Sequence, residues 1–130
     1  MIVRTLDSVT GTDFDVIAHN SLWRSRRICT HADGMGFSVS ETVIEEGAKL
    51  HLHYKHHLEG VYCISGHGVL MSVDDGKKYN IVPGTIYLLN NHDKHTLSAC
   101  SAMRLLCIFS PALSGRETHD ESGSYPELLE

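Results

Sequence analysis

Short runs of strand-forming residues, interrupted by glycine or proline about every ten residues, fill most of this sequence. Many short strands at such regular spacing are typical of a β-sandwich or a closed barrel. The Asp-Gly pair in "SVDDGKKY" favours a tight hairpin turn. No window has a long helical period, and the single helix that we expect is short and lies near Asp13–Ser21. The predicted strands are Ile2–Leu6, Arg27–Thr30, Gly36–Ile44, Lys49–Tyr54, Leu58–Ile64, Gly68–Val73, Lys78–Ile81, Thr85–Asn90, Thr96–Ala99 and Arg104–Ser110.

The length of the chain predicts one domain, because 130 residues can enclose a single hydrophobic core. We therefore expect an all-β, jelly-roll-like barrel over residues 1–130. From Ser114 onward the sequence "SGRETHDESGSYPELLE" is polar and rich in turn residues. Residues 114–130 are accordingly predicted to form a mobile C-terminal tail that can act as a lid.

The charge of the chain argues against two classes of partner. A formal net charge of −5 disfavours nucleic acid and acidic membranes. Arg24, Arg26 and Arg27 form a basic cluster that is too small to reverse this. No run approaches the roughly 18 apolar residues of a membrane span, and the opening residues lack the apolar core of a secretory signal.

The cysteines point to a reducing compartment. None of them forms a CxxC pair, and two lie in apolar predicted strands, which favours reduced thiols over disulfides. We therefore expect a cytoplasmic protein. The four cysteines are Cys29, Cys63, Cys100 and Cys107.

Histidines are unusually concentrated beside one apolar strand. Six of the ten histidines lie between positions 51 and 92, and either they surround a metal inside a barrel or they form a polar rim without chemistry. In the predicted strand Leu58–Ile64, one face carries Glu59, Val61 and Cys63. The opposite face carries Leu58, Tyr62 and Ile64. Both faces are apolar apart from Glu59, so we expect the strand to be buried on both sides. A carboxylate inside such a barrel is costly unless it is paired or binds a metal.

One segment contains Gly47, His53, Glu59 and Gly66, and a second reads "PGTIYLLNN". By their spacing they resemble the first and second sequence motifs of the cupin superfamily, whose members are small barrels that usually hold a metal. The chain departs from the usual cupin pattern twice. Lys55 stands where the first motif usually has a second histidine, and Tyr87 replaces the histidine of the second motif.

These departures match one family. Essentially the whole chain is similar to the ectoine synthase family, through the segments "WRSRR", "DGMGFSVSET", "HYKHHLEGVYCISGHG", "PGTIYLLNNHDKH" and "SPALSGRETHDESGSYP". The resemblance implies a hydro-lyase of osmolyte biosynthesis that closes N-γ-acetyl-L-2,4-diaminobutyrate into ectoine with loss of water. It also implies a metal, most often ferrous iron, held by Glu59, Tyr87 and His95. Zinc, manganese or cobalt would also suit nitrogen and oxygen ligands.

The resemblance extends to roles for further residues. Arg27 would bind the carboxylate of the substrate through two hydrogen bonds, and Gly115 would help the tail to close the mouth of the barrel. A head-to-tail homodimer is also implied, with Leu106 and Ile108 as candidate contacts. The candidates for proton transfer are Tyr54, His57 and His119. The candidates for substrate binding are Trp23, Arg27, Ser40, Thr42, Leu89, Phe109 and Glu117.

The residues also allow interpretations without this chemistry. Tyr87 suits the core as a plain strand aromatic, and His95 suits a surface loop. Glu59 could be a structural carboxylate satisfied by a neighbouring lysine or by backbone groups. A second possibility is a different cupin enzyme, either a metal-dependent dioxygenase or an enzyme that acts on a related acetylated amine or amide. A third is a non-catalytic cupin that binds a small metabolite.

Overall fold

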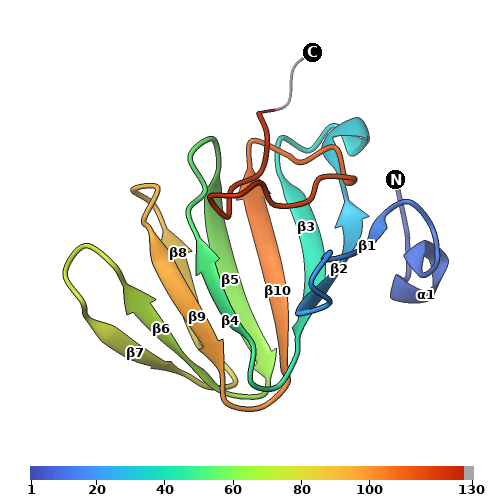
Figure 1. Cartoon of the computed structure of the whole chain (residues 1–130). Coiled ribbons are helices and arrows are strands. Elements are labelled where there is room, and N and C mark those ends of the chain that lie inside the picture. The colour runs from blue at the N-terminus through green and yellow to red at the C-terminus, as the bar shows by residue number, and fades with distance from the viewer. Residues whose placement is uncertain (128–130) are drawn as a thin grey trace.

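The computed structural model describes residues 1–127 and places their strands in two antiparallel sheets that face each other (Figure 1). One sheet has the strand order β1-β2-β3-β10-β5-β8 and the other β4-β9-β6-β7. The elements are α1 (Leu6–Val9), β1 (Asp15–Ile17), β2 (Trp23–Cys29), η1 (His31–Asp33), β3 (Ser38–Ile44), β4 (Lys49–Leu52), β5 (Leu58–Ser65), β6 (Gly68–Ser72), β7 (Lys78–Ile81), β8 (Ile86–Leu89), β9 (His95–Ala99) and β10 (Met103–Ser110).

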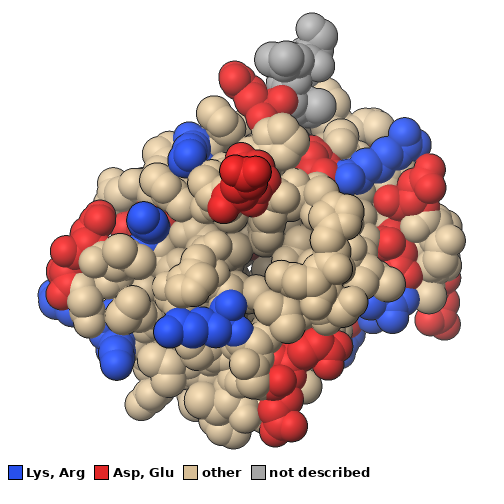
Figure 2. All heavy atoms as spheres, in the orientation of Figure 1, with Lys and Arg blue, Asp and Glu red and all other residues tan. Residues whose placement is uncertain are grey.

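The all-β prediction is confirmed, and the strands from β3 to β10 lie close to their predicted positions. The Asp-Gly hairpin also forms, because β6 and β7 pair as antiparallel neighbours around it. None of the helices described within residues 1–127 is long and apolar enough to span a membrane. On the face shown in Figure 2, acidic and basic side chains are dispersed among neutral ones rather than gathered in a basic stripe.

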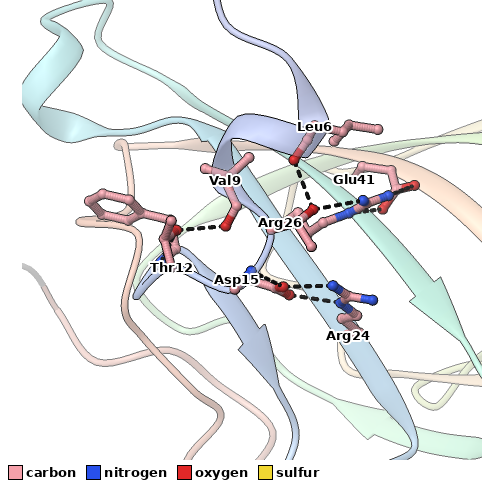
Figure 3. Close-up of polar contacts among 10 residues, drawn as sticks. Leu6, Val9, Thr12, Asp15, Arg24, Arg26 and Glu41 are labelled. Atoms are coloured by element: carbon pink, nitrogen blue, oxygen red, sulfur yellow. Dashed lines mark hydrogen bonds and ion pairs between the residues drawn. The ribbon is translucent and has the colours of Figure 1, made fainter.

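Both predictions for the N-terminal residues are wrong. The expected strand Ile2–Leu6 does not form: residues 2–5 belong to no helix or strand, and Leu6 begins helix α1, where Thr5 and Ser8 form a reciprocal capping box. The expected helix near Asp13–Ser21 instead contains strand β1, which pairs with β2. Asp15 favours this pairing, since its carboxylate accepts two hydrogen bonds from Arg24 at 2.6 and 2.7 Å (Figure 3).

Strand β5 is buried on one side only, which contradicts the expectation of two buried faces. On the inner face Glu59, Val61 and Cys63 are at most 7% exposed. The outer face is apolar but open to solvent in the single chain, because no element within residues 1–127 covers the six-stranded sheet there. We call these exposed residues the outer apolar face: Leu58, Tyr62, Ile64, Ile86, Leu88 and Ile108, with 37–64% exposure.

The C-terminal segment crosses one end of the barrel, at the top in Figure 1. The backbone N–H of His53 donates to the carbonyl of Gly123 at 3.0 Å, and the N–H of Lys55 donates to the Ser124 hydroxyl at 3.1 Å. Ser124 and Tyr125 are buried as a result. The predicted mobility of this tail stays a prediction, and its last residues, 128–130, lie outside the described part of the chain.

Candidate active site

A row of inward-facing residues crosses the six-stranded sheet. Arg27 is paired with Ser40, Ser40 with Cys107, Cys107 with Val61, and Val61 with Tyr87. Paired residues of neighbouring strands have Cβ atoms about 5 Å apart. The strand register therefore places Arg27, a candidate for substrate binding, and Tyr87, a candidate metal ligand, in the same inward-facing row.

Glu59 lies in the next row, between Phe109 and Leu89 and diagonal to Tyr87. It is 7% exposed, and among the residues that the structure describes no lysine or arginine forms an ion pair with it. Burial raises the pKa of the Glu59 carboxyl to about 8, against the opposing effect of a hydrogen bond with the Cys107 thiol. The interpretation in which a lysine balances Glu59 therefore has no support in the described residues.

His95 begins β9 on the opposite sheet and is 2% exposed, so it is not a surface loop histidine. Its Nδ1 lies 2.8 Å from the carbonyl oxygen of Asp93. A carbonyl can only accept, so Nδ1 carries the hydrogen and Nε2 carries the lone pair. Burial lowers the pKa of His95 and keeps the ring neutral. Nε2 is buried and has no hydrogen-bond partner among the described residues.

The donor atoms of the predicted ligands Glu59, Tyr87 and His95 are of the kinds that a divalent metal binds. Their donor atoms are a carboxylate, a phenol oxygen and an imidazole nitrogen, a set that suits iron, zinc, manganese or cobalt. The hydrogen bond from Nδ1 of His95 to a carbonyl is the usual support of a metal-binding histidine. Within residues 1–127 no three His, Cys, Asp or Glu side chains gather into a metal site, so this set depends on the phenol of Tyr87. Burial, followed by the Glu59 charge, raises the pKa of that phenol well above its ordinary value, and a cation would oppose both effects.

An aromatic layer closes one end of the interior. The Tyr54 hydroxyl and Nε2 of His119 share a hydrogen bond of 2.8 Å. The His119 ring lies 4.9 Å from the Trp23 ring, and Tyr54 packs edge-on against Phe109 at 5.0 Å. Burial, together with the charge of Arg27, lowers the pKa of His119 to about 4. His119 is therefore a neutral base near pH 7.

Arg27 is a buried cation that forms no ion pair with a carboxylate of the described residues. It is 1% exposed, its Nε donates to the Ser25 hydroxyl at 2.9 Å, and its Nη2 donates to the Tyr125 hydroxyl at 3.2 Å. Nη1 has no partner, and no carboxylate of the described residues pairs with this guanidinium. Such a group favours an incoming carboxylate.

The two neighbouring arginines have different partners. Arg24 is paired with Asp15, and Arg26 is paired with Glu41 at 2.8 Å (Figure 3). Alternation along β2 turns both of them away from the interior that Arg27 faces. Arg27 is thus the arginine of this cluster that remains available to a ligand inside the barrel.

The remaining predicted residues are placed as follows. His57 is 1% exposed with neither ring nitrogen hydrogen-bonded, and burial lowers its pKa. Burial would raise the pKa of Glu117, but hydrogen bonds from Ser114 and Gly115 outweigh it and lower that pKa. The Glu117 carboxylate thus stabilises the turn in which it lies and does not bind within the barrel interior. A narrow cavity of ≈ 30 Å³ is lined by seven predicted residues. These are Trp23, Thr42, Tyr54, Glu59, Tyr87, Phe109 and His119.

The barrel also has an open side. A groove of ≈ 680 Å³ runs between β7 and β8, the edge strands of the two sheets, and is lined by Tyr87, Leu89 and His95 among others. Tyr87 therefore borders both the interior cavity and this groove.

Sequence reasoning missed three residues of the interior: Ser25, Cys107 and Tyr125. Alternation along "WRSRR" places Ser25 on the same face as Trp23 and Arg27, so the pattern contained that signal. Alternation with Phe109 likewise turns Cys107 inward. Tyr125 stands in a polar segment without periodicity and has no such signal.

Comparison with known proteins identifies the family of the chain. The family model for ectoine synthase matches residues 1–128. An L-ectoine synthase from Desulfatibacillum aliphaticivorans is 51% identical over 98% of both chains. The crystal structure of ectoine synthase from P. lautus superposes with a TM-score of 0.87 at 45% identity, covering 100% of this chain and 92% of the other.

A more distant likeness concerns the fold alone. A cupin 2 conserved barrel domain protein from Salinispora arenicola has a TM-score of 0.66 at 19% identity, over 85% of this chain and 88% of the other. The predicted cupin-type barrel is thus confirmed. The family match across the full length and the close relatives lead to one conclusion: the chain belongs to the ectoine synthase family.

Proposed function

We propose that this chain closes N-γ-acetyl-L-2,4-diaminobutyrate into ectoine. The α-amine attacks the acetamide carbon, a C–N bond forms, and the amide oxygen leaves as water with two protons from the amine. The reaction makes the protein a carbon–oxygen lyase of the hydro-lyase class. One observation supports this most: an unpaired guanidinium nitrogen of Arg27 and an unpaired imidazole nitrogen of His95 are both buried within the same barrel.

Substrate binding begins at Arg27. A carboxylate there would gain charge-assisted hydrogen bonds from Nη1 and Nη2 and would compensate a buried charge. Ser25 holds the guanidinium in place through Nε, and Thr42 donates to Ser25 at 3.4 Å. Arg27 would fix the carboxylate while the apolar walls hold the substrate in a folded conformation. The amine and the carbonyl are then close together before the reaction, which lowers the entropic part of the activation barrier.

The acetamide end of the substrate is assigned to Glu59, Tyr87 and His95. We expect ferrous iron there, with zinc, manganese or cobalt as substitutes. When bound, the metal supplies Lewis-acid polarisation of the amide carbonyl, which is otherwise a poor electrophile. Phe109 and Leu89 flank Glu59 and keep this end of the interior apolar.

Proton transfer is assigned to Tyr54 and His119, with His57 as the second candidate. His119 has a low pKa, so it can accept the proton of the amine only as the C–N bond forms and that proton becomes acidic. The Tyr54 hydroxyl, at 2.8 Å from Nε2, can relay the proton. The tail segment that carries His119 also covers the mouth of the barrel, and the exclusion of water favours a dehydration.

We also propose that the protein forms a homodimer and acts in the cytoplasm. The outer apolar face supports the dimer, because 42% of Ile108 and 64% of Leu88 are exposed in the single chain. Leu106, the other candidate contact, is half-buried. The four cysteines are free thiols, as expected in a reducing compartment.

The test is incubation of the purified protein with N-γ-acetyl-L-2,4-diaminobutyrate and ferrous iron under reducing conditions, with products separated by chromatography. Formation of ectoine supports the proposal. Oxygen uptake coupled to turnover would favour a dioxygenase instead. Binding of the substrate without product, in the presence of metal, would favour a non-catalytic cupin.

A further inference from the structure

Tyr125 belongs to the C-terminal segment, yet its side chain fills the centre of the candidate site. It is 4% exposed. Its hydroxyl accepts the hydrogen bond from Nη2 of Arg27, and its ring lies 5.6 Å from the guanidinium carbon. The same ring stacks on Tyr54 at 5.2 Å and an interplanar angle of 27°, and lies 4.5 Å from the His119 ring. A tail residue therefore contacts three residues assigned to substrate binding and proton transfer.

With Tyr125 in place, little room is left inside the barrel. The cavity that Tyr125 lines together with Glu59 and Tyr87 has a volume of ≈ 30 Å³. That volume accommodates about one water molecule, whereas small-molecule sites usually measure about 300–1,000 Å³. An acetylated amino acid does not fit in this cavity unless a side chain leaves. Tyr54, His119 and Tyr125 line it from outside the barrel strands, and Tyr125 is the one whose hydroxyl is hydrogen-bonded to Arg27.

The attachment of Tyr125 is local. The two residues before it are held to the loop after β4 by the hydrogen bonds from His53 and Lys55. Gly123 has a φ of +76°, and an added Cβ would collide with the His51 carbonyl, so the segment packs closely only in this conformation. Detaching residues 123–125 breaks these contacts without opening either sheet.

We propose that Tyr125 occupies the place of the substrate in the closed protein, and that the substrate's carboxylate displaces the Tyr125 phenol from Arg27. This inference rests on the proposed function for the identity of the substrate. A phenol is a neutral partner for a guanidinium near pH 7, while a carboxylate is a charged one, so the exchange favours the ligand. Tyr125 then lowers the affinity for the substrate by competing from within the chain.

The test compares Tyr125→Phe with the wild type and with Tyr79→Phe. The first substitution removes only the hydroxyl that occupies Arg27. The second removes the same atom from a tyrosine that is 49% exposed on β7. Calorimetric titration is done with N-γ-acetyl-L-2,4-diaminobutyrate and, separately, with L-2-aminobutyrate, which carries the same α-amino acid end without the acetamide. Thermal melting confirms that each variant is folded.

The fluorescence of Trp23 provides a second measurement, because it is the single tryptophan of the chain and its ring lies 4.9 Å from that of His119. Displacement of Tyr125 disturbs the His119 ring that stacks on it, so emission should change on ligand binding. Ser124→Ala serves as a second variant. It removes the hydroxyl that accepts from Lys55 and loosens the segment without touching Arg27.

Tyr125→Phe should bind both ligands about 3- to 10-fold more tightly than the wild type, as expected when one competing hydrogen bond is lost. Ser124→Ala should tighten binding about 2-fold, and Tyr79→Phe should match the wild type. In turnover, Tyr125→Phe should lower KM by a larger factor than it changes kcat. Unchanged or weaker binding by folded Tyr125→Phe, or no binding of either ligand to the wild type, overturns the proposal.

The outcomes separate this inference from the proposed function. If both ligands bind more tightly to Tyr125→Phe but the wild type forms no ectoine, the displacement stands and the proposed reaction fails. If the wild type forms ectoine but Tyr125→Phe shows no gain in affinity, the reaction stands and the displacement fails.

Discussion

The carboxylate of Glu59 lies beside the thiol of Cys107 inside the barrel, and no ion pair with a described basic residue balances it. A buried carboxylate with so weak a partner is protonated more readily than one in water. A cation bound nearby would reverse this preference. The folding stability of the protein should therefore respond to pH differently with and without metal.

The metal-free protein should lose stability as the pH rises above about 6.5. The pKa of Glu59 is raised from 4.5 to about 8, so its contribution is fully present below 4.5 and is lost as the pH rises through 8. The lowered pKa values of His57, His95 and His119 act in the opposite direction, but only below about 6.5. Between pH 6.5 and 8 the loss should reach about 2 kcal/mol.

Urea unfolding of chelator-treated protein across this pH range measures the effect. Glu59→Gln should abolish the slope, and added ferrous iron should remove or invert it in the wild type. A wild-type stability that rises between pH 6.5 and 8 without metal would contradict this account of Glu59.

Glu59→Ala should lose metal and turnover but keep a folded barrel. The substitution removes one of three proposed ligands and leaves a small cavity rather than an unpaired charge. Elemental analysis after gel filtration gives the metal content. Glu46→Ala, a change of an exposed carboxylate in the turn after β3, is the matched control and should retain both metal and activity. Full metal content in Glu59→Ala would show that the ligand assignment is incorrect.

Arg27→Gln should weaken substrate binding about 10- to 100-fold, because two charge-assisted hydrogen bonds to the carboxylate are lost. The control is Arg24→Gln on the same strand, whose guanidinium is paired with Asp15 on the outside of the barrel. Calorimetry on both variants decides the role. Equal affinities in Arg27→Gln and Arg24→Gln would exclude Arg27 as the carboxylate site.

Gly115→Ala should destabilise the protein by about 2 kcal/mol. Gly115 has a φ of +105°, and an added Cβ would lie 2.6 Å from the Phe14 ring and 2.7 Å from the Thr30 methyl group. Gly34→Ala isolates the effect of the backbone, since Gly34 has a φ of +75° and open space around it. Gly34→Ala should cost about 1 kcal/mol. Equal losses in the two thermal melts would mean that the tail does not pack at Gly115.

The sequence predicts the strands of the barrel well where apolar, strand-forming runs are separated by turn residues, as in β5, β6 and β10. It fails near the N-terminus because polar side chains decide the structure there: Thr5 with Ser8 makes a helix, and Asp15 with Arg24 makes a strand pair. The capping box joins Thr5 and Ser8 within one turn, whereas Asp15 and Arg24 come from two different strands that meet only on folding. Hydrophobic periodicity in the sequence cannot anticipate the pairing of Asp15 with Arg24.

The site was predictable only in part. Alternation in "WRSRR" separates Arg27 from its two neighbours, but no local pattern distinguishes Tyr87 as a ligand from Tyr87 as a core aromatic. Only the motif resemblance did that. Tyr125 was missed because its burial follows from two hydrogen bonds between distant segments, one to the Gly123 carbonyl and one to the Ser124 hydroxyl.

The central claim is that the barrel interior closes an acetylated diamine into a ring by removing water. The most direct measurement is NMR of N-γ-acetyl-L-2,4-diaminobutyrate, labelled with 13C at the acetyl carbonyl, incubated without oxygen with ferrous-loaded protein. The amide carbon signal should be replaced by that of the ring amidine carbon of ectoine, with no oxygen consumed. Unchanged substrate, in the presence of folded and metal-loaded protein, would contradict the account.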